Sequence, residues 1–225
     1  MRNPWKDTPM TGDFVLPMDE EFVMAHNLIY RRKKEHQIDL RLPPAPFFGL
    51  HDAPVVVLLA NAGVYPDDLE IQLLEANKRM ILESIASPNG KPFVDLSSDY
   101  AIPAKSAWWK HHTRDLAAVV GGYDELSRKI LAIELHGYHS KKWSPPLANF
   151  PSQQYSFHLV RQAMDRGALI ITARCRDYWL AAVPELATYQ NVIKKTKSPR
   201  AAHLSTGNLT APDFAKLVKA LKAES

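Results

Sequence analysis

The sequence predicts an α/β protein whose central sheet is mostly parallel and covered by helices on both faces. Four short apolar runs are near-continuous rather than alternating, which is typical of strands buried on both faces. Segments with helical spacing of apolar residues separate these runs, as in successive strand–helix units. The chain has 225 residues, of which 46% are hydrophobic and 23% charged, enough for a sizeable core. We therefore expect one three-layer α/β/α domain with a four-stranded sheet over residues 47–225.

Residues 1–46 are expected to form an N-terminal arm and a helix that packs on the main domain. Residues 1–17 are polar and marked by proline, and predict a loose arm. Asp19 to His36 is the expected helix, and its basic end, Arg31 to Lys34, suits the negative end of a helix dipole. Its expected apolar positions are Phe22, Met24, Leu28 and Ile29.

The main domain is then expected to alternate strands with helices. The four expected strands are Pro54–Ala60, Ile130–Leu135, Ala168–Ala173 and Asn191–Lys195. The expected helices are Asp67–Ser87, Trp108–Val120, Asp124–Arg128, Ser152–Arg166, Asp177–Glu185 and Ala211–Lys222. Turn residues such as Ser87-Pro88-Asn89-Gly90 and the helix-capping Gly167 support the boundaries. Phe93 to Ala107 has no regular pattern and is expected to be irregular.

Composition limits the compartment and the partners. A single cysteine, Cys175, excludes an internal disulfide and favours a reducing compartment. The first residues lack the apolar segment of a signal peptide, and no apolar run approaches the length of a membrane helix. We expect a cytoplasmic monomer without a membrane partner and without a cofactor. The formal net charge of +4 permits a polyanionic partner without requiring one.

Polar side chains follow each expected strand, where open α/β sheets bind their ligands. The segments concerned are Asn61-Ala62-Gly63, Glu134–Ser140, Arg174–Asp177 and Thr196–Arg200. If the strands are parallel, all four lie on one rim and bring together an amide, a carboxylate, two histidines and several cations.

Several familiar chemistries lack their motif in this chain. Neither the glycine pattern of a dinucleotide fold nor that of a phosphate-binding P-loop is present, and the hydrolase nucleophile elbow is also missing. His136 and His139 have zinc-ligand spacing, but no third ligand stands at a recognisable distance, so we expect no metal. An amide with nearby aromatic residues and cations instead suits a base or nucleotide, because an amide both donates and accepts hydrogen bonds. Phe47 and Phe48 fit a ligand stack and a core position equally well.

The order of these segments resembles that of the uracil-DNA glycosylase superfamily. Leu59-Ala60-Asn61-Ala62-Gly63 is similar to the first motif of that family, written Gly-Met-Asn-Pro-Gly in some branches. Lys195 to Arg200 resembles its last motif, with Ser198-Pro199 matching and Thr196 at the position of a histidine. Glu134 stands where the family has an asparagine that reads the base. The resemblance covers roughly residues 47–221.

The resemblance implies a DNA base-excision hydrolase that acts on a flipped or single-stranded base. Asn61 would position a water, and His136 or His139 would stabilise the leaving base. The residues implied to bind the base are Phe48, Ala62, Gly63, Tyr65, Glu134 and Tyr138. Those implied to hold phosphates are Ser140, Lys141, Lys142, Lys197, Ser198 and Arg200. A charged Glu134 would oppose the developing anion unless it is protonated or points elsewhere.

Other interpretations stay open at the level of sequence. The sequence is equally compatible with a protein of the same fold that binds DNA or a nucleotide without catalysis, or that hydrolyses another small substrate. It is also compatible with an unrelated doubly wound domain that has polar residues at its strand ends, and with an interaction protein in which the rim is only surface. A catalytic site needs Asn61 and a histidine within reach of a closed pocket of base size. A binder needs only a continuous positive groove.

Overall fold

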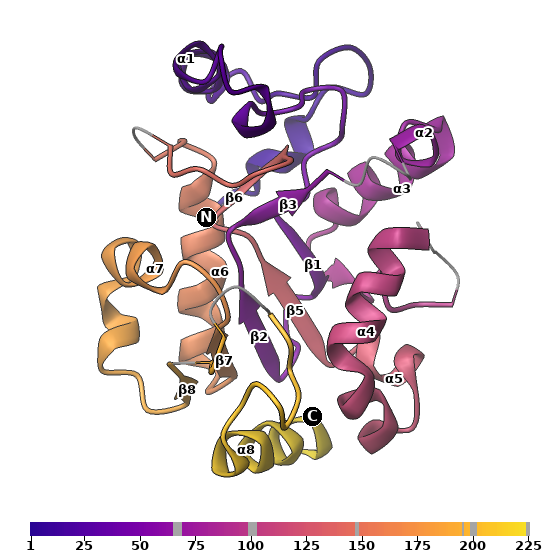
Figure 1. Ribbon diagram of the computed structural model, residues 1–225, viewed down its shortest axis with the longest axis vertical. Coiled ribbons are helices and arrows are strands. Elements are labelled where there is room, and N and C mark those ends of the chain that lie inside the picture. Colours follow the sequence, from indigo (N-terminus) through magenta and orange to yellow (C-terminus); the bar gives the residue numbers. More distant parts are fainter. Residues whose placement is uncertain (65–68, 99–102, 147–148, 195, 199–201, 224–225) are drawn as a thin grey trace.

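A computed structural model of the chain describes residues 1–64, 69–98, 103–146, 149–194, 196–198 and 202–223 (Figure 1). It contains a six-stranded sheet with the strand order β4-β1-β5-β2-β7-β8. The strands are β4 (Gly90–Lys91), β1 (Phe47–Leu50), β5 (Ile130–Ile133), β2 (Val55–Leu58), β7 (Leu169–Thr172) and β8 (Val192–Ile193).

The sheet is mixed, which corrects the expected four-stranded, mostly parallel sheet. The four strands predicted from sequence do pair in parallel: β2 with β5 and β7, and β7 with β8. The two additional strands, β1 and β4, pair antiparallel, β1 lying between β5 and β4. Both are short, and each contains a glycine, so neither gives the apolar run by which a buried strand is predicted.

Gly49 allows β1 to lie against β5. Its φ of +121° lies in a region that side chains disfavour, and a Cβ built there would stand 2.2 Å from the Ile130 carbonyl oxygen. The contact leaves no room for any side chain, because the obstacle is backbone of the neighbouring strand. Gly49 is therefore required both for its dihedral angle and for its lack of bulk.

A second, two-stranded parallel ribbon continues beyond the sheet. It consists of β3 (Asn61–Gly63) and β6 (His136–Ser140), with Asn61 opposite His136 and Gly63 opposite Ser140. Each strand of the ribbon follows a strand of the main sheet after a short break. The segments that the sequence predicts as rim loops are thus partly a buried ribbon, since all five residues of β6 are buried.

Helices surround the sheet and the ribbon. In Figure 1, α1 and the ribbon lie at one end of the central strands and α8 at the other, while α6 and α7 flank one side and α4 and α5 the opposite side. None of the described helices is long and apolar enough to cross a membrane. The helices are α1 (Glu20–Ile29), α2 (Leu69–Gln72), α3 (Glu75–Ala86), α4 (Pro103–Val120), α5 (Tyr123–Ser127), α6 (Gln153–Asp165), α7 (Arg176–Ala182) and α8 (Ala211–Lys222).

Three helix predictions need correction. The helix expected over 67–87 is divided, because α2 ends at Gln72 and α3 begins only at Glu75. The helix expected over 19–36 ends at Ile29, and it buries Val23 and His26 while Met24 and Leu28 are 63% and 64% exposed. The basic run that follows belongs to turns rather than to the helix end. The helix expected from Trp108 begins at Pro103, five residues earlier, and so includes part of the segment expected to be irregular.

The N-terminal arm is packed rather than loose. Trp5, Phe14 and Leu16 are each 1% exposed and belong to the main hydrophobic core. The Asn3 amide nitrogen donates to the Ile85 carbonyl oxygen at 2.7 Å, and the Trp5 ring meets the Tyr138 ring edge-on. The segment is rich in prolines and charged residues, and its three large apolar side chains are spaced too irregularly to predict a helix or a strand. Their burial could therefore not be predicted from the sequence.

We predict that Gly49→Ala destabilises the protein by more than the roughly 1 kcal/mol that a strained glycine dihedral costs alone, because the added methyl group also collides with β5. Gly12→Ala is the matched control, since Gly12 also has a positive φ but nothing lies within 4 Å of its built Cβ. Urea unfolding of the two variants measures the difference. Equal losses would contradict the proposed steric role.

Candidate functional site

A partly enclosed cavity of about 150 Å³ lies at the carboxyl ends of β2, β5 and β7. The sheet forms its floor, the β3–β6 ribbon one wall and α4 another. Its lining residues are Phe47, Phe48, Leu59, Asn61, Ala62, Gly63, Lys105, Trp108, Trp109, Ala132, Glu134, Ser140, Lys141, Trp143 and Arg174. It is therefore the place where an open α/β sheet is expected to bind a ligand.

The Asn61 amide is held in one orientation by the ribbon. Its nitrogen donates to the Ser140 hydroxyl oxygen at 2.9 Å and to the Ala62 carbonyl oxygen at 3.0 Å, with a longer contact of 3.4 Å to the Tyr138 carbonyl oxygen. The Ser140 hydroxyl in turn donates to the Lys142 carbonyl oxygen. All of these partners are acceptors, so the amide nitrogen must face them and the amide oxygen remains available as an acceptor in the cavity wall.

Glu134 lines the cavity directly after β5 and is neutral over most of the physiological range. Burial raises the pKa of its carboxyl to about 8, against the opposing attraction of Lys105 and Arg174. Its Oε2 atom is buried and has no hydrogen-bond partner among the described residues. A protonated carboxyl at this position donates as well as accepts a hydrogen bond, which a carboxylate cannot do.

Two cations line the cavity, one on α4 and one in the segment after β7. The Lys105 ammonium, on α4, is 3.1 Å from an Asp95 carboxylate oxygen and 4.2 Å from the centre of the Phe48 ring. Both side chains of this ion pair are buried, and burial raises the pKa of Asp95 while Lys105 partly opposes that shift. Arg174 follows β7, and its backbone nitrogen donates to the Leu58 carbonyl oxygen at 3.1 Å. These positive charges favour a ligand rich in hydrogen-bond acceptors.

Aromatic rings form much of the remaining wall. Trp108 and Trp109 lie on α4 and meet edge-on, and Trp109 also meets Phe93, which stacks on Phe48. Trp143 also lines the cavity, and its indole nitrogen is buried without a hydrogen-bond partner among the described residues. The wall thus offers flat apolar surfaces.

Seven of the residues predicted from sequence come together at this cavity. They are Phe48, Asn61, Ala62, Gly63, Glu134, Ser140 and Lys141. The predicted convergence at the strand ends therefore holds for the first three expected strands, because Arg174, which follows β7, also lines the cavity.

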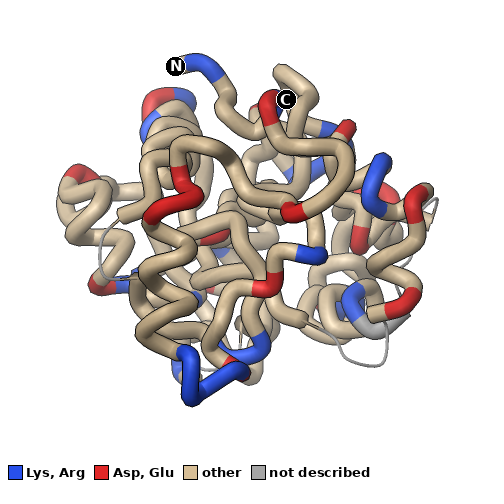
Figure 2. Tube along the Cα trace, turned by 90° about the horizontal axis from the view of Figure 1, so that it is seen from above, with Lys and Arg blue, Asp and Glu red and all other residues tan. Residues whose placement is uncertain are grey.

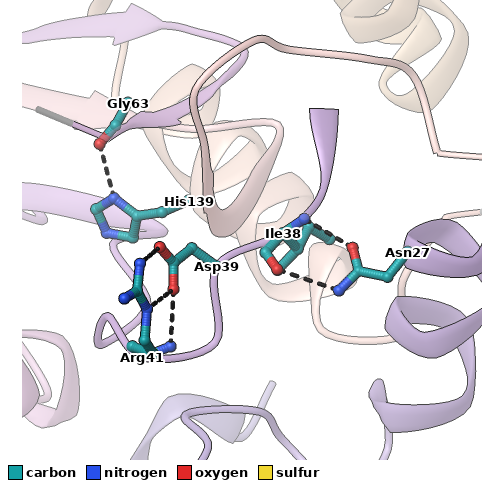
Figure 3. A network of polar contacts seen from close by, with 6 residues as sticks. All are labelled: Asn27, Ile38, Asp39, Arg41, Gly63 and His139. Atoms are coloured by element: carbon teal, nitrogen blue, oxygen red, sulfur yellow. Dashed lines mark hydrogen bonds and ion pairs between the residues drawn. The ribbon is translucent and has the colours of Figure 1, made fainter. Parts of the chain in front are cut away.

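Both predicted catalytic histidines lie away from the cavity. The ring of His136 packs edge-on against Phe150, and burial lowers its pKa to about 3. The His139 Nδ1–H donates to the Gly63 carbonyl oxygen at 2.8 Å, and burial lowers its pKa to about 4. In Figure 3 the His139 ring lies beside the Asp39–Arg41 ion pair, in a network that joins the N-terminal segment to the ribbon. Both imidazoles are therefore neutral at physiological pH, and both pack in the interior of the protein.

Tyr138 is likewise buried in the core rather than in the cavity. Its hydroxyl donates to the Asp19 carboxylate at 2.7 Å and accepts from the Leu16 backbone nitrogen at 3.2 Å. The second Asp19 carboxylate oxygen accepts from the Ser152 backbone nitrogen. Tyr138 thus ties the N-terminal arm to β6, which replaces the base-binding role predicted for it.

The predicted phosphate-binding residues are dispersed. Lys142 is exposed and 3.6 Å from a Glu35 carboxylate oxygen. The Lys197 backbone nitrogen donates to the Asn208 carbonyl oxygen and the Ser198 backbone nitrogen to the Asn208 side chain, so this segment is held by a neighbouring turn and does not line the cavity. The predicted residues Tyr65 and Arg200 lie outside the described residues.

Charged residues of one sign do not dominate the trace in the view from above. Figure 2 shows basic residues interspersed with acidic ones, with the longest unbroken basic stretch at one edge. The longest basic run of the sequence, Arg31 to Lys34, is exposed throughout. Within the described part of the chain, no group of three or more His, Cys, Asp or Glu residues is placed to hold a metal ion.

Comparison with protein families, curated proteins and solved structures finds no match to this chain. The chemistry of the cavity is therefore inferred from its own residues.

Sequence analysis missed the residues that α4 contributes to the cavity. Lys105 falls in the segment expected to be irregular, and Trp108 and Trp109 fall at the start of the expected helix 108–120, for which no ligand contact was predicted. The available signal is the spacing of Lys105, Trp108 and Trp109, which places them on one face of a helix that begins before Trp108. Arg174 lies in a segment already predicted to face the rim, but it was not selected as a site residue.

We predict that Tyr138→Phe lowers stability by about 1–3 kcal/mol, because it leaves the buried Asp19 carboxylate and the Leu16 amide each short of a partner. Ligand binding at the cavity should be unchanged in the folded variant. Urea unfolding gives the stability. A variant that is fully stable but cannot bind would restore Tyr138 to the binding site.

We predict that Glu134 contributes a pH dependence of stability that is absent in Glu134→Gln. Between about pH 5 and about pH 8 the unfolded chain ionises Glu134 while the folded chain keeps its proton. The contribution of this group to the stability of the wild type therefore falls as pH rises, by at most about 1.4 kcal/mol per pH unit. The variant should gain on the wild type across this window, as urea titrations at several pH values will measure.

Glu125→Gln is the control for this comparison, because Glu125 is exposed on α5 and should leave the pH profile of the wild type intact. Parallel profiles for the wild type and Glu134→Gln would mean that Glu134 is already ionised in the folded protein near neutral pH.

Proposed function

We propose that the protein binds one extruded or single-stranded base in this cavity and hydrolyses its N-glycosidic bond, as a DNA base-excision hydrolase of the uracil-DNA glycosylase type. The observation that carries the proposal is a small, aromatic-walled cavity at the strand ends with Asn61 and a neutral Glu134 in its wall. The likeness of residues 59–63 to the first motif of that family supports the same choice.

The size of the cavity favours a base over a whole nucleotide. A cavity of about 150 Å³ in another protein holds a single benzene ring. Drug-sized ligands occupy clefts of roughly 300–1,000 Å³. A base alone fits this limit when it is turned out of the stack, with its sugar and phosphates left outside. Trp108, Trp109 and Phe48 provide flat apolar surface for its ring.

Asn61 is the residue suited to direct a water molecule. Its amide oxygen is an available acceptor, and its orientation is fixed by three contacts of the nitrogen. In the proposed reaction the water oxygen bonds to the sugar carbon, and the bond from that carbon to the base nitrogen breaks. The base leaves with the electron pair and then takes up a proton.

Stabilisation of the leaving base is assigned to Glu134, Lys105 and Arg174. A protonated Glu134 donates a hydrogen bond to the developing negative charge, which removes the electrostatic objection to a carboxylate at this position. Lys105 and Arg174 line the same cavity and add positive charge. They take the role that the sequence assigned to His136 or His139.

Lys141 is the basic residue best placed to hold a phosphate beside the base. It is exposed and lines the cavity, next to the ribbon residue Ser140. The remaining charge would come from residues farther away, such as the exposed Lys142 and Lys197.

A second function, binding of nucleic acid or a nucleotide without catalysis, is favoured by one observation. No described histidine lines the cavity, although a histidine donor is part of the catalytic set that the resemblance implies. Binding of this kind uses the same wall and weakens steeply with salt.

The test uses labelled single- and double-stranded oligonucleotides that carry uracil, hypoxanthine or xanthine, followed by alkaline cleavage at abasic sites. We expect strand scission with wild type and a loss of at least about tenfold in rate for Asn61→Ala, because the water loses its acceptor. Asn89→Ala is the matched control, since Asn89 is exposed in a turn outside the cavity.

Scission that Asn61→Ala leaves intact would rule out the proposed role of Asn61. Absence of scission together with a salt-sensitive mobility shift would replace the hydrolase by the binder. Absence of both would remove DNA as the partner and direct the search to small nucleotides.

A further inference from the structure

The outward face of α1 is apolar. Three of the eight large apolar side chains that the described part of the chain exposes lie on this helix: Met24, Leu28 and Ile29, with exposed fractions of 63%, 64% and 47%. Together with the exposed Ala25 they share one face, because residues three and four apart are neighbours on a helix. Single exposed apolar residues are normal, but a contiguous group of them is typical of a binding surface.

The inner face of α1 is fastened to the chain that follows it. The Asn27 side-chain nitrogen donates to the Ile38 carbonyl oxygen at 3.1 Å, and the Ile38 backbone nitrogen donates to the Asn27 side-chain oxygen at 2.7 Å (Figure 3). Val23 and His26 of the helix are buried. Turning the helix to bury its outer face would break these contacts, so the outer face is a fixed surface.

Charges of opposite sign lie at the two ends of this face. Glu20 and Glu21 are exposed in the first turn of α1, and the exposed run Arg31 to Lys34 follows its last turn. None of these side chains forms an ion pair with another described residue. The helix dipole favours this order of charges, but it does not account for the exposed apolar residues between them. Along the chain the face is thus acidic, then apolar, then basic.

Such a face is complementary to a second copy of itself that runs in the opposite direction. When two α1 helices pair antiparallel about a two-fold axis, the acidic end of each meets the basic end of the other and the apolar residues meet in the middle. A parallel pair would place like charges together at both ends. A uniformly anionic partner, such as a lipid surface, would be repelled by Glu20 and Glu21. The charge pattern therefore favours a second copy of this chain.

We propose that the protein forms a symmetric dimer through antiparallel contact of its α1 helices, centred on Met24 and Leu28. This dimer replaces the monomer expected from the sequence. In Figure 1, α1 lies at one end of the molecule, where a second copy can approach. No residue of α1 is among those that line the cavity, so the dimer is independent of the function proposed for the cavity.

The small contact area limits the strength of the dimer. A ten-residue helix is about 15 Å long. Two such faces bury less than the roughly 1,200–2,000 Å² of a standard protein–protein interface. We therefore expect a dissociation constant on the order of 10–100 μM, which makes the dimer depend on protein concentration.

Sedimentation equilibrium of the full chain from about 1 μM to about 500 μM measures this dissociation constant. Leu28→Glu places a charge in the centre of the contact, and two-fold symmetry places it there twice. Leu74→Glu is the matched control, because Leu74 is 56% exposed and precedes α3. We expect Leu28→Glu to weaken association by at least about tenfold and Leu74→Glu to leave it unchanged. Circular dichroism checks that both variants fold as wild type does.

Two charge-reversal variants test the direction of pairing. E20K/E21K makes both ends of the face positive, and R31E/R32E removes the attraction at its basic end. Each variant alone should associate at least about tenfold more weakly than wild type at about 50 mM salt, because like charges then face each other. An equimolar mixture of the two should associate as wild type does, since opposite charges meet again. This rescue also shows that neither variant has simply failed to fold.

A wild type that stays monomeric up to about 500 μM would overturn the dimer. Binding of that monomer, but not of its Leu28→Glu variant, to vesicles of phosphatidylserine and phosphatidylcholine would assign the face to a lipid surface instead. Association that Leu28→Glu leaves intact would place the interface elsewhere and overturn the role of α1. Association that both charge reversals leave unchanged would overturn the antiparallel arrangement.

Discussion

The continuous parallel pairing of two chain segments beyond the end of the main sheet determines the site. β2 pairs with β5 up to Leu58 and Ile133, and the same two segments pair again as β3 and β6 from Asn61 and His136 onward. Between the two stretches the Leu59 nitrogen donates to the Ile133 carbonyl and the His136 nitrogen to the Ala60 carbonyl, so pairing is never lost. β3 and β6 belong to a separate ribbon rather than to the main sheet, and the cavity lies where the ribbon diverges from the sheet. Backbone pairing, rather than a mobile loop, therefore sets the position of Asn61 and Glu134.

The cavity combines two electrostatic conditions that oppose each other. Its wall is buried enough to favour a neutral Glu134, while Lys105 and Arg174 stand close enough to lower the pKa of that carboxyl. The Lys105 ammonium forms an ion pair with the buried Asp95 and lies over the face of the Phe48 ring. These two contacts limit how strongly it lowers the pKa of Glu134. A site built in this way can offer a hydrogen-bond donor and positive charge at once. That combination suits a leaving group which becomes more negative as its bond breaks.

The sequence predicted those strands whose burial on both faces requires a continuous run of apolar residues. The apolar runs around Val55, Ile130 and Ile170 form parallel strands because both faces of the sheet are covered, and polar residues behind all three runs meet at one cavity. The ribbon could not be predicted, because β6 buries the polar residues His136, His139 and Ser140 through hydrogen bonds and ring contacts instead of apolar side chains. The contribution of α4 was missed for another reason: Lys105 and Trp109 are separated in sequence from every strand end.

The buried carboxylate of Asp19 also has a consequence for the order of events during synthesis. Its hydrogen-bond partners, Tyr138 and the Ser152 backbone, lie 119 and 133 residues further along the chain. When Asp19 leaves the ribosome, neither partner yet exists, and the adjacent Trp5, Phe14 and Leu16 have no core to enter. Contacts between residues so distant in sequence slow folding, since a long loop must close before they form. The segment around Asp19 is thus made well before its partners and is among the last to pack. Throughout that interval its apolar side chains are exposed to chaperones and to other nascent chains.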